Sequence, residues 1–129
     1  MDLLTKGKIG ELGIFQELLK RGIEVYPNLV DNDGIDAVIR VDGCFYTVQI
    51  KTATKTSLVK HKGTAQIRRY SFRFGTTGTR ADFTICDTPE GRYIIPKQKI
   101  TSADSFVIYP DAKRAASLVF KEAWSLIKS

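Results

Sequence analysis

The chain has 129 residues, of which 43% are hydrophobic and 26% charged, the composition of an ordinary globular protein, and we expect residues 1–129 to form a single domain. No apolar run approaches the roughly 20 residues that a membrane span needs, and no signal-peptide pattern opens the chain, which argues against a membrane protein and predicts a cytoplasmic one. Lysine and arginine number 20 against 14 acidic residues, and the net charge of +6 favours a polyanionic partner.

The first predicted element is a helix from Thr5 to Arg21, with Thr5 as its N-cap and Gly22 as its stop. Glu11 projects into the middle of the apolar arc of this helix, where a carboxylate is costly to bury unless a cation meets it. Three glycines predict close packing of the helix against a neighbour: Gly7, Gly10 and Gly13.

A short strand over 23–26 is predicted next, closed by Pro27 and followed by a loop rich in Asn and Asp. Two apolar, β-branched runs then flank Asp42-Gly43, which is the strongest short-range signal of a β-hairpin. A two-residue loop at this position pairs Val41 with Cys44.

This hairpin register brings three polar residues together. It places Asp36 directly opposite Gln49, and Lys51 shares their face one pleat further along the strand. A carboxylate, an amide oxygen and an ammonium group on one sheet face can hold a metal ion and a phosphate. We therefore take this face as the candidate site.

The middle of the chain is strongly basic. From Gly43 through Ala81 there is no Asp or Glu, although the segment holds eight lysine and arginine residues, with His61 beside them. A charged run is usually a solvated surface, but one this long without an acid favours a phosphate backbone as its counterpart. The candidate DNA-binding residues are Lys6, Lys8, Lys55, Lys60, Lys62, Arg68, Arg69, Arg73 and Arg80.

Within the basic segment, Tyr70–Phe74 alternates as a strand does, with Arg73 on its polar face, and the glycine-rich stretch 75–79 is expected to be a mobile loop. A second hairpin is predicted from Phe83–Cys86 and Tyr93–Ile95.

The end of the chain is predicted to hold an edge strand near Phe106–Tyr109 and an amphipathic helix from Asp111 to Lys128. Cys44 and Cys86 have no metal-ligand spacing and are predicted to be buried free thiols.

The order of a helix with a buried Glu11, a strand with Gly34-Ile35-Asp36 and a strand with Gln49-Ile50-Lys51 resembles the PD-(D/E)XK nuclease superfamily. Among its small members, the chain is similar to group I intron homing endonucleases and archaeal Holliday-junction resolvases. The resemblance covers roughly residues 5–53, with weaker likeness in the later strands. It implies an α/β fold with a restriction-endonuclease-like core, in which an N-terminal and a C-terminal helix flank a central mixed β-sheet.

The resemblance also implies a metal site and roles for its residues. Glu11, Asp36, Gln49 and the backbone carbonyl of Ile50 would bind Mg²⁺, for which Mn²⁺ would substitute, and Lys51 would orient the attacking water or neutralise the scissile phosphate. The superfamily usually has an acid where this chain has Gln49. An amide oxygen can still bind Mg²⁺, but it brings no charge.

Each residue of the motif also has an ordinary explanation. Asp36 could cap the preceding turn, Lys51 could extend to solvent from a strand end, and Glu11 could pair with Lys8. Their joint arrangement favours the nuclease hypothesis.

The leading prediction is a metal-dependent DNA endonuclease, whether homing, junction-resolving or restriction-like. The alternatives are a catalytically inactive nucleic-acid-binding protein with the nuclease fold, or a structural subunit whose basic face meets acidic protein. One small domain covers little double-stranded or branched DNA, so we expect a homodimer or homotetramer.

Overall fold

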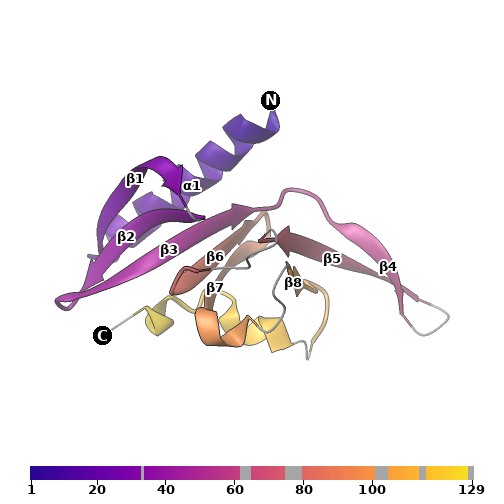
Figure 1. The fold of residues 1–129 in the computed structure, drawn as a ribbon. Helices are drawn as coiled ribbons and strands as arrows, with labels where there is room; N and C mark the ends of the chain where they lie inside the picture. Colours follow the sequence, from indigo (N-terminus) through magenta and orange to yellow (C-terminus); the bar gives the residue numbers. More distant parts are fainter. Residues whose placement is uncertain (33, 62–64, 75–79, 101–104, 114–115, 128–129) are drawn as a thin grey trace.

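The computed structural model describes residues 1–32, 34–61, 65–74, 80–100, 105–113 and 116–127 (Figure 1). Lys62 and the glycine-rich stretch 75–79 lie outside these described residues. Within the described part of the chain, no helix is both long and apolar enough to cross a membrane.

The N-terminal helix α1 spans Leu3–Lys20, two residues further toward the N-terminus than predicted. Its N-cap is Asp2 rather than Thr5, because the Asp2 carboxylate accepts a hydrogen bond of 2.7 Å from the backbone N–H of Thr5. Gly22, at φ 79°, follows the C-cap in the left-handed conformation that ends many helices. The predicted helix and its stop are therefore confirmed.

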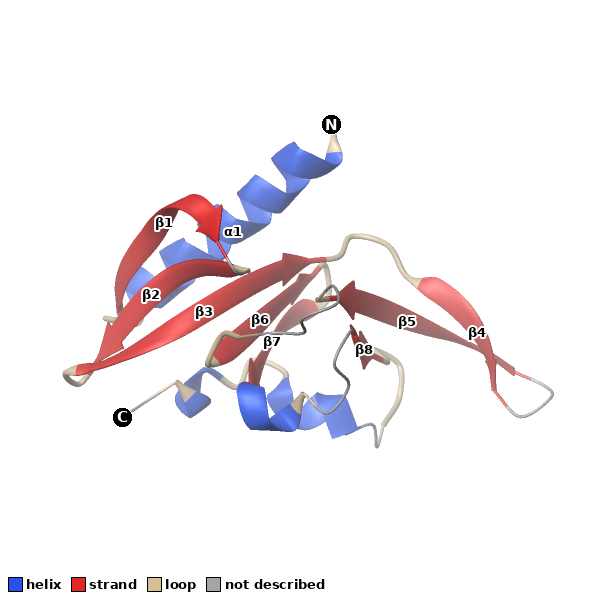
Figure 2. Cartoon of the chain, in the orientation of Figure 1, coloured by secondary structure: helices blue, strands red, loops and turns tan. Residues whose placement is uncertain are grey.

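The central sheet is mixed and has five strands in the order β1-β2-β3-β6-β7, with only the β3–β6 pair parallel (Figure 2). The strands are β1 (Glu24–Asn32), β2 (Ile35–Val41), β3 (Cys44–Thr52), β6 (Phe83–Thr88) and β7 (Gly91–Pro96). A side-chain clasp accompanies the parallel pair, since the Asp82 carboxylate accepts a hydrogen bond of 2.9 Å from the backbone N–H of Thr47.

The predicted β2–β3 hairpin is confirmed in register as well as in type. Val41 pairs with Cys44, and the ladder continues as far as Ala37 and Val48. Asp42 and Gly43 both have positive φ, 49° and 82°, as a two-residue hairpin turn requires. The ladder ends one residue before Asp36.

Strand β1 is longer than predicted. The sequence indicates a strand that stops at Pro27, but pairing with β2 includes Pro27 and resumes at Asn32 after an irregularity. Proline is tolerated here because β1 lies at the edge of the sheet, where its missing N–H has no partner to lose.

A second sheet has the order β4-β5-β8 and bounds Ser57–His61, Ala65–Arg73 and Ser105–Ile108. The predicted strand at Tyr70–Phe74 is the C-terminal half of β5, and the predicted edge strand near Phe106 is β8. The β4–β5 hairpin extends away from the central sheet (Figure 1). Residues 57–61 and 65–69 of this hairpin are called the arm below.

The central sheet has a hydrophobic cluster on each face. On one face Ile85 and Ile94 pack with Ile14 and Leu18 of α1. On the other face Cys86, Tyr93 and Ile95 pack against side chains of the second sheet, including Tyr70, Phe72 and Ile108. Alternation along β6 and β7 sends neighbouring residues to opposite clusters.

The predicted C-terminal helix from Asp111 to Lys128 is wrong. Two short 3₁₀ helices, Ala116–Phe120 and Trp124–Leu126, occupy the described part of this segment. Lys121 bridges to Tyr93, and the Glu122 N–H donates to the Arg92 carbonyl at 2.6 Å. The segment thus binds the free edge of β7 and crosses it, and a continuous helix could not make these sheet contacts.

The prediction of two buried thiols is half right. Cys86 is fully buried, and desolvation raises the pKa of its thiol, whereas Cys44 is exposed beside the hairpin turn.

Candidate active site

Glu11 and Asp36 line the same small cavity, although they come from different elements. The cavity has a volume of about 150 Å³ and is bounded by Lys8, Glu11, Asn28, Leu29, Ile35 and Asp36. Two carboxylates and one ammonium group therefore meet between the middle of α1 and the start of β2. Both carboxylates are among the candidate metal ligands named from the sequence.

Asp36 is held against β3 by a backbone hydrogen bond. Its Oδ2 atom accepts from the Ile50 N–H at 2.6 Å, at the point where the β2–β3 ladder has ended. The side chain thus replaces the next backbone contact and fixes the carboxylate at the margin of the sheet. Ile50 itself packs on the apolar face that α1 covers.

Glu11 is only partly exposed, at 21% of its side chain, and lies 3.5 Å from the Lys8 ammonium group. This pair is the ordinary explanation that the sequence left open, and the structure contains it. It does not remove Glu11 from the cavity, because both residues line it.

Gln49 and Lys51 lie outside the cavity lining, on the face of β3 opposite α1. Gln49 is buried at 6% exposure, and its Nε2 atom would be 2.7 Å from a Cβ at Gly34. Lys51 is partly buried and pairs in register with Cys86. The Gln49 amide therefore reaches the turn just before Asp36, with its nitrogen nearest Gly34.

Two residues of the cavity were missed by the sequence analysis. Asn28 and Leu29 fall in a segment predicted to be a loop, but they belong to β1, and Asn28 donates to the Ile35 carbonyl at 2.5 Å. An Asn directly after a strand proline was the only available signal, and it equally indicates a turn.

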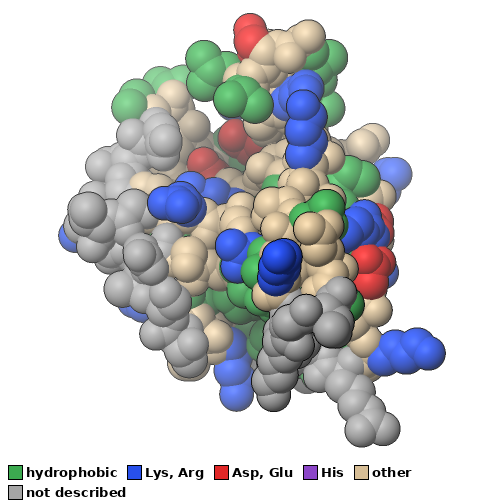
Figure 3. Space-filling view, turned by 90° about the vertical axis from the view of Figure 1, so that its right-hand side faces the viewer, with side chains coloured by type: hydrophobic (Ala, Val, Ile, Leu, Met, Phe, Trp, Pro, Cys, Tyr) green, Lys and Arg blue, Asp and Glu red, His purple; other side chains and the backbone are tan. Residues whose placement is uncertain are grey.

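The predicted DNA-binding residues occupy different parts of the molecule. Lysine and arginine side chains are distributed over the face viewed in Figure 3, with acidic ones in a few places. Lys55, Lys60, Arg73 and Arg80 are exposed, and Lys8 lines the cavity. Lys6 is also on α1 but lines a separate pocket beside Gly10 and Thr52. Arg68 differs from the rest, since two carboxylates bind it.

Comparison with known proteins gives a match to one family model and to a solved structure. A family model described as PD-(D/E)XK endonuclease matches residues 1–126. Among solved structures, a bacterial homing endonuclease, I-Ssp6803I, is similar with a TM-score of 0.72 and 23% identity, over 98% of this chain and 93% of that one. That likeness concerns the fold. No curated protein matches the chain significantly.

Proposed function

Because the chain belongs to the PD-(D/E)XK endonuclease family, we propose that it hydrolyses phosphodiester bonds of DNA with the help of a divalent metal ion. The observation that carries this proposal is the convergence of Glu11 and Asp36 on one cavity. Neither the length of α1 nor the hairpin requires these two carboxylates to meet.

The donor set suits a hard cation. Carboxylate, amide and carbonyl oxygens are the ligands that Mg²⁺ and Mn²⁺ prefer. No group of three or more His, Cys, Asp or Glu side chains gathers anywhere in the described residues, so two carboxylates need help from neutral oxygens. We assign this role to the Ile50 carbonyl and to the Gln49 amide, which would have to turn its oxygen toward Asp36 from outside the cavity lining. Mg²⁺ is the proposed ion, with Mn²⁺ as a substitute.

The proposed role of each site residue follows from its charge. Asp36 and Glu11 supply the negative charge that holds the cation, and the Ile50 N–H keeps the Asp36 carboxylate in place. Lys51, on the face of β3 that also carries Gln49, would orient water or neutralise a phosphate oxygen. When bound, the metal ion lowers the pKa of water and offsets the negative charge that develops at phosphorus.

A matched pair of variants tests the proposal. Asp36→Asn keeps an oxygen that can accept from Ile50 but loses the charge, and it should abolish Mg²⁺-dependent cleavage while leaving DNA binding largely intact. Asp82→Asn is its control, because Asp82 makes the same kind of contact to the Thr47 N–H. Cleavage in excess EDTA, or equal loss in both variants, would contradict the proposed metal site.

The structure of the relative suggests which substrates to try first. A long duplex site is the natural choice given its homing-endonuclease name, followed by a four-way junction and a plasmid. We also propose that the chain acts as a homodimer or homotetramer, which light scattering in solution would measure directly.

A second candidate function is a nucleic-acid-binding protein without catalysis. The buried neutral Gln49 favours it, since the site then has one charged ligand fewer than an acid at that position would supply. Titration with Mg²⁺ and Mn²⁺ separates the two, because only the nuclease should convert substrate in a metal-dependent way.

A further inference from the structure

Arg68 and Arg69 are adjacent in β5 but point to opposite faces of the strand. Alternation places Arg68 with Tyr70 and Phe72, which are buried against the central sheet. It places Arg69 with Ser71 and Arg73. Ser71 and Arg73 are exposed, and Arg69 is half-buried. Arg69, Ser71 and Arg73 are called the outward row below.

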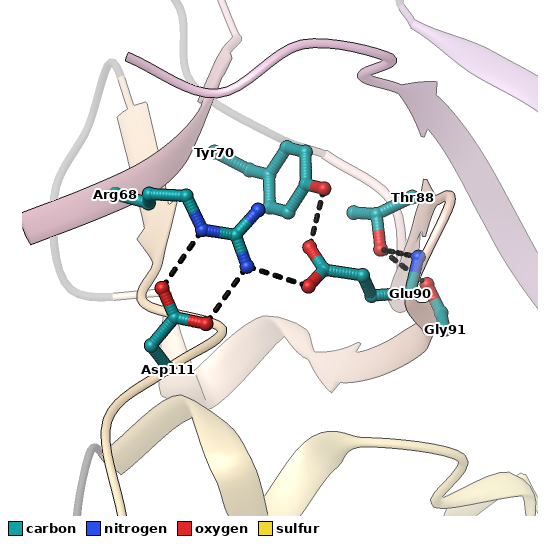
Figure 4. Close-up of polar contacts among 6 residues, drawn as sticks. All are labelled: Arg68, Tyr70, Thr88, Glu90, Gly91 and Asp111. Carbon is teal, nitrogen blue, oxygen red and sulfur yellow. Dashed lines mark hydrogen bonds and ion pairs between the residues drawn. The ribbon is translucent and has the colours of Figure 1, made fainter. Parts of the chain in front are cut away.

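Arg68 is clamped between two carboxylates (Figure 4). Its Nε and Nη2 atoms donate to the two oxygens of Asp111 at 2.8 and 2.7 Å, and Nη2 also donates to Glu90 at 2.7 Å. The other oxygen of Glu90 accepts from the Tyr70 hydroxyl at 2.5 Å. Such a bidentate, shared guanidinium fixes orientation as well as charge.

The two carboxylates belong to the body of the molecule rather than to the arm. Glu90 lies in the β6–β7 turn, where its N–H donates to the Thr88 hydroxyl at 3.3 Å, and that hydroxyl donates to the Gly91 carbonyl at 2.7 Å (Figure 4). Asp111 follows β8. The clamp therefore ties the base of the arm to two separate segments of the body.

The clamp makes Arg68 a poor partner for DNA. Its single positive charge faces two negative ones, and an approaching phosphate would meet the same carboxylates. Hydrogen bonds from Tyr70 and Arg68 lower the pKa of Glu90, and those from Arg68 lower the pKa of Asp111, so both remain ionised near neutrality.

Arg69 is in the opposite situation. Its Nε atom is buried without a hydrogen-bond partner among the described residues, and no ion pair is described for it. It lies across from Ser57 of β4. No Asp or Glu stands between Gly43 and Ala81 in the sequence, so any acid that faces the outward row must come from another segment, as Glu90 and Asp111 do for Arg68.

We propose that the outward row is the DNA-contacting face of the hairpin and that Arg68 is a positioning residue, which holds the arm in a fixed orientation on the nuclease body. This proposal rests on the proposed function for its ligand, duplex DNA, and replaces the prediction that Arg68 contacts phosphate. The row begins with Arg69 at the base of the arm and continues with Ser71 and Arg73 in the β5–β8 ladder. A two-stranded β-ribbon is narrow enough to enter the major groove, so a rigidly held arm would bring the row alongside the duplex.

Arg68→Ala and Arg69→Ala form a matched pair, since each removes the same side chain one residue apart. Binding to random-sequence duplex should be measured against salt in EDTA, where cleavage does not interfere. Arg69→Ala should reduce the slope of log K against log[salt] by about 0.9, the value of one lost phosphate contact, whereas Arg68→Ala should leave the slope unchanged. A reduced slope in Arg68→Ala, or an unchanged one in Arg69→Ala, would overturn the assignment.

Hydrogen exchange gives a readout that needs no DNA. Amides of β4 and of the arm part of β5 should exchange faster in Arg68→Ala and in Glu90→Gln than in wild type, and at the wild-type rate in Arg69→Ala. Equal exchange in all four proteins would overturn the positioning role. If wild type bound no DNA while exchange behaved as expected, the proposed function would fail and the clamp would stand.

Glu90→Gln also distinguishes a phosphate-contacting Arg68 from a positioning Arg68, because the two roles predict opposite changes in DNA binding. If Arg68 contacted phosphate, removing its carboxylate partner would strengthen binding and steepen the salt slope. As a positioning residue, Arg68 should need Glu90, so cleavage of a specific substrate should show a raised KM with an unchanged salt slope. Stronger, steeper binding by Glu90→Gln would contradict the proposal.

Discussion

Two aspartates of this protein each accept a hydrogen bond from a backbone N–H of β3, at positions three residues apart along that strand. Asp36 binds Ile50 and Asp82 binds Thr47. Only Asp36 lines the cavity that Glu11 also reaches. The same local chemistry therefore serves sheet cohesion at Thr47, and we propose that it serves metal binding at Ile50.

Gln49 offers a test of the metal site through stability rather than activity. Gln49→Glu places a charged oxygen in a side chain that is only 6% exposed. Without metal, this should lower the free energy of unfolding by about 1–3 kcal/mol, because a charged carboxylate loses its hydration at a buried position. Mn²⁺ should then raise the unfolding temperature more in Gln49→Glu than in wild type.

Gln49→Ala is the companion variant for this measurement, and it should show the smallest rise with Mn²⁺. If calorimetry found the same Mn²⁺ affinity in wild type and both variants, residue 49 would not be a ligand.

At the scale of elements, α1 packs through one glycine and not through another. A Cβ at Gly10 would collide with the Thr52 hydroxyl and lie 2.9 Å from the Asp87 carboxylate, whereas a Cβ at Gly7 would have nothing within 4 Å. The predicted close packing is therefore confirmed for Gly10. At Gly13 a Cβ would meet only the end of the Arg92 side chain, at 2.9 Å.

Alanine at Gly10 and alanine at Gly7 should change the stability of the protein in opposite directions. Gly10→Ala should lower the free energy of unfolding by about 1–3 kcal/mol, because α1 must move away from β3. Gly7→Ala should raise it by roughly 0.5–1 kcal/mol through helix propensity alone. Urea denaturation of both variants measures this, and a stable Gly10→Ala protein would mean that α1 is free to shift.

The elements that could be predicted from the sequence are those with local signals. The Asp42-Gly43 turn sets its own hairpin register, and Gly22 ends α1 without help from tertiary contacts. The prediction of a C-terminal helix was wrong because the edge of β7 competes for the same backbone groups, as the bridge between Lys121 and Tyr93 shows. Amphipathic periodicity cannot reveal such a competitor.

The same distinction applies to the candidate site. The hairpin register aligned Asp36 with β3 correctly, but the approach of Glu11 depends on how α1 packs, and the roles of Asn28 and Arg68 depend on distant segments. Nothing near Arg68 in the sequence indicates that Asp111 will bind it.

At the scale of the whole molecule, the Arg68 clamp joins the second sheet to the body and should make stability depend on acidity. The hydrogen bond from Tyr70 is the main cause that lowers the pKa of Glu90. The hydrogen bonds from Arg68 lower the pKa of Asp111. At pH values between the lowered and the ordinary pKa of these carboxyl groups, the unfolded chain therefore binds more protons than the folded one. The contribution is therefore present above pH 4.5, the ordinary glutamate pKa, and is lost as pH falls through the folded values.

Urea denaturation as a function of pH measures this contribution, and Glu90→Gln should show a shallower loss of stability in acid than wild type. Asp87 acts in the opposite direction, because burial raises the pKa of its carboxyl, and it is unchanged in both proteins. Parallel acid profiles for the two proteins would show that the clamp carries no net stability.

The parallel pairing of β3 with β6 has a consequence for how this protein can diversify. Thr47 and Asp82, which clasp that pair, are 35 positions apart, and the arm lies within the loop they close. The entropy of closing a loop grows only with the logarithm of its length, so even doubling the whole loop would cost about 0.6 kcal/mol. Evolution could therefore lengthen or shorten the arm beyond Arg68 while the central sheet continued to fold, at little thermodynamic penalty.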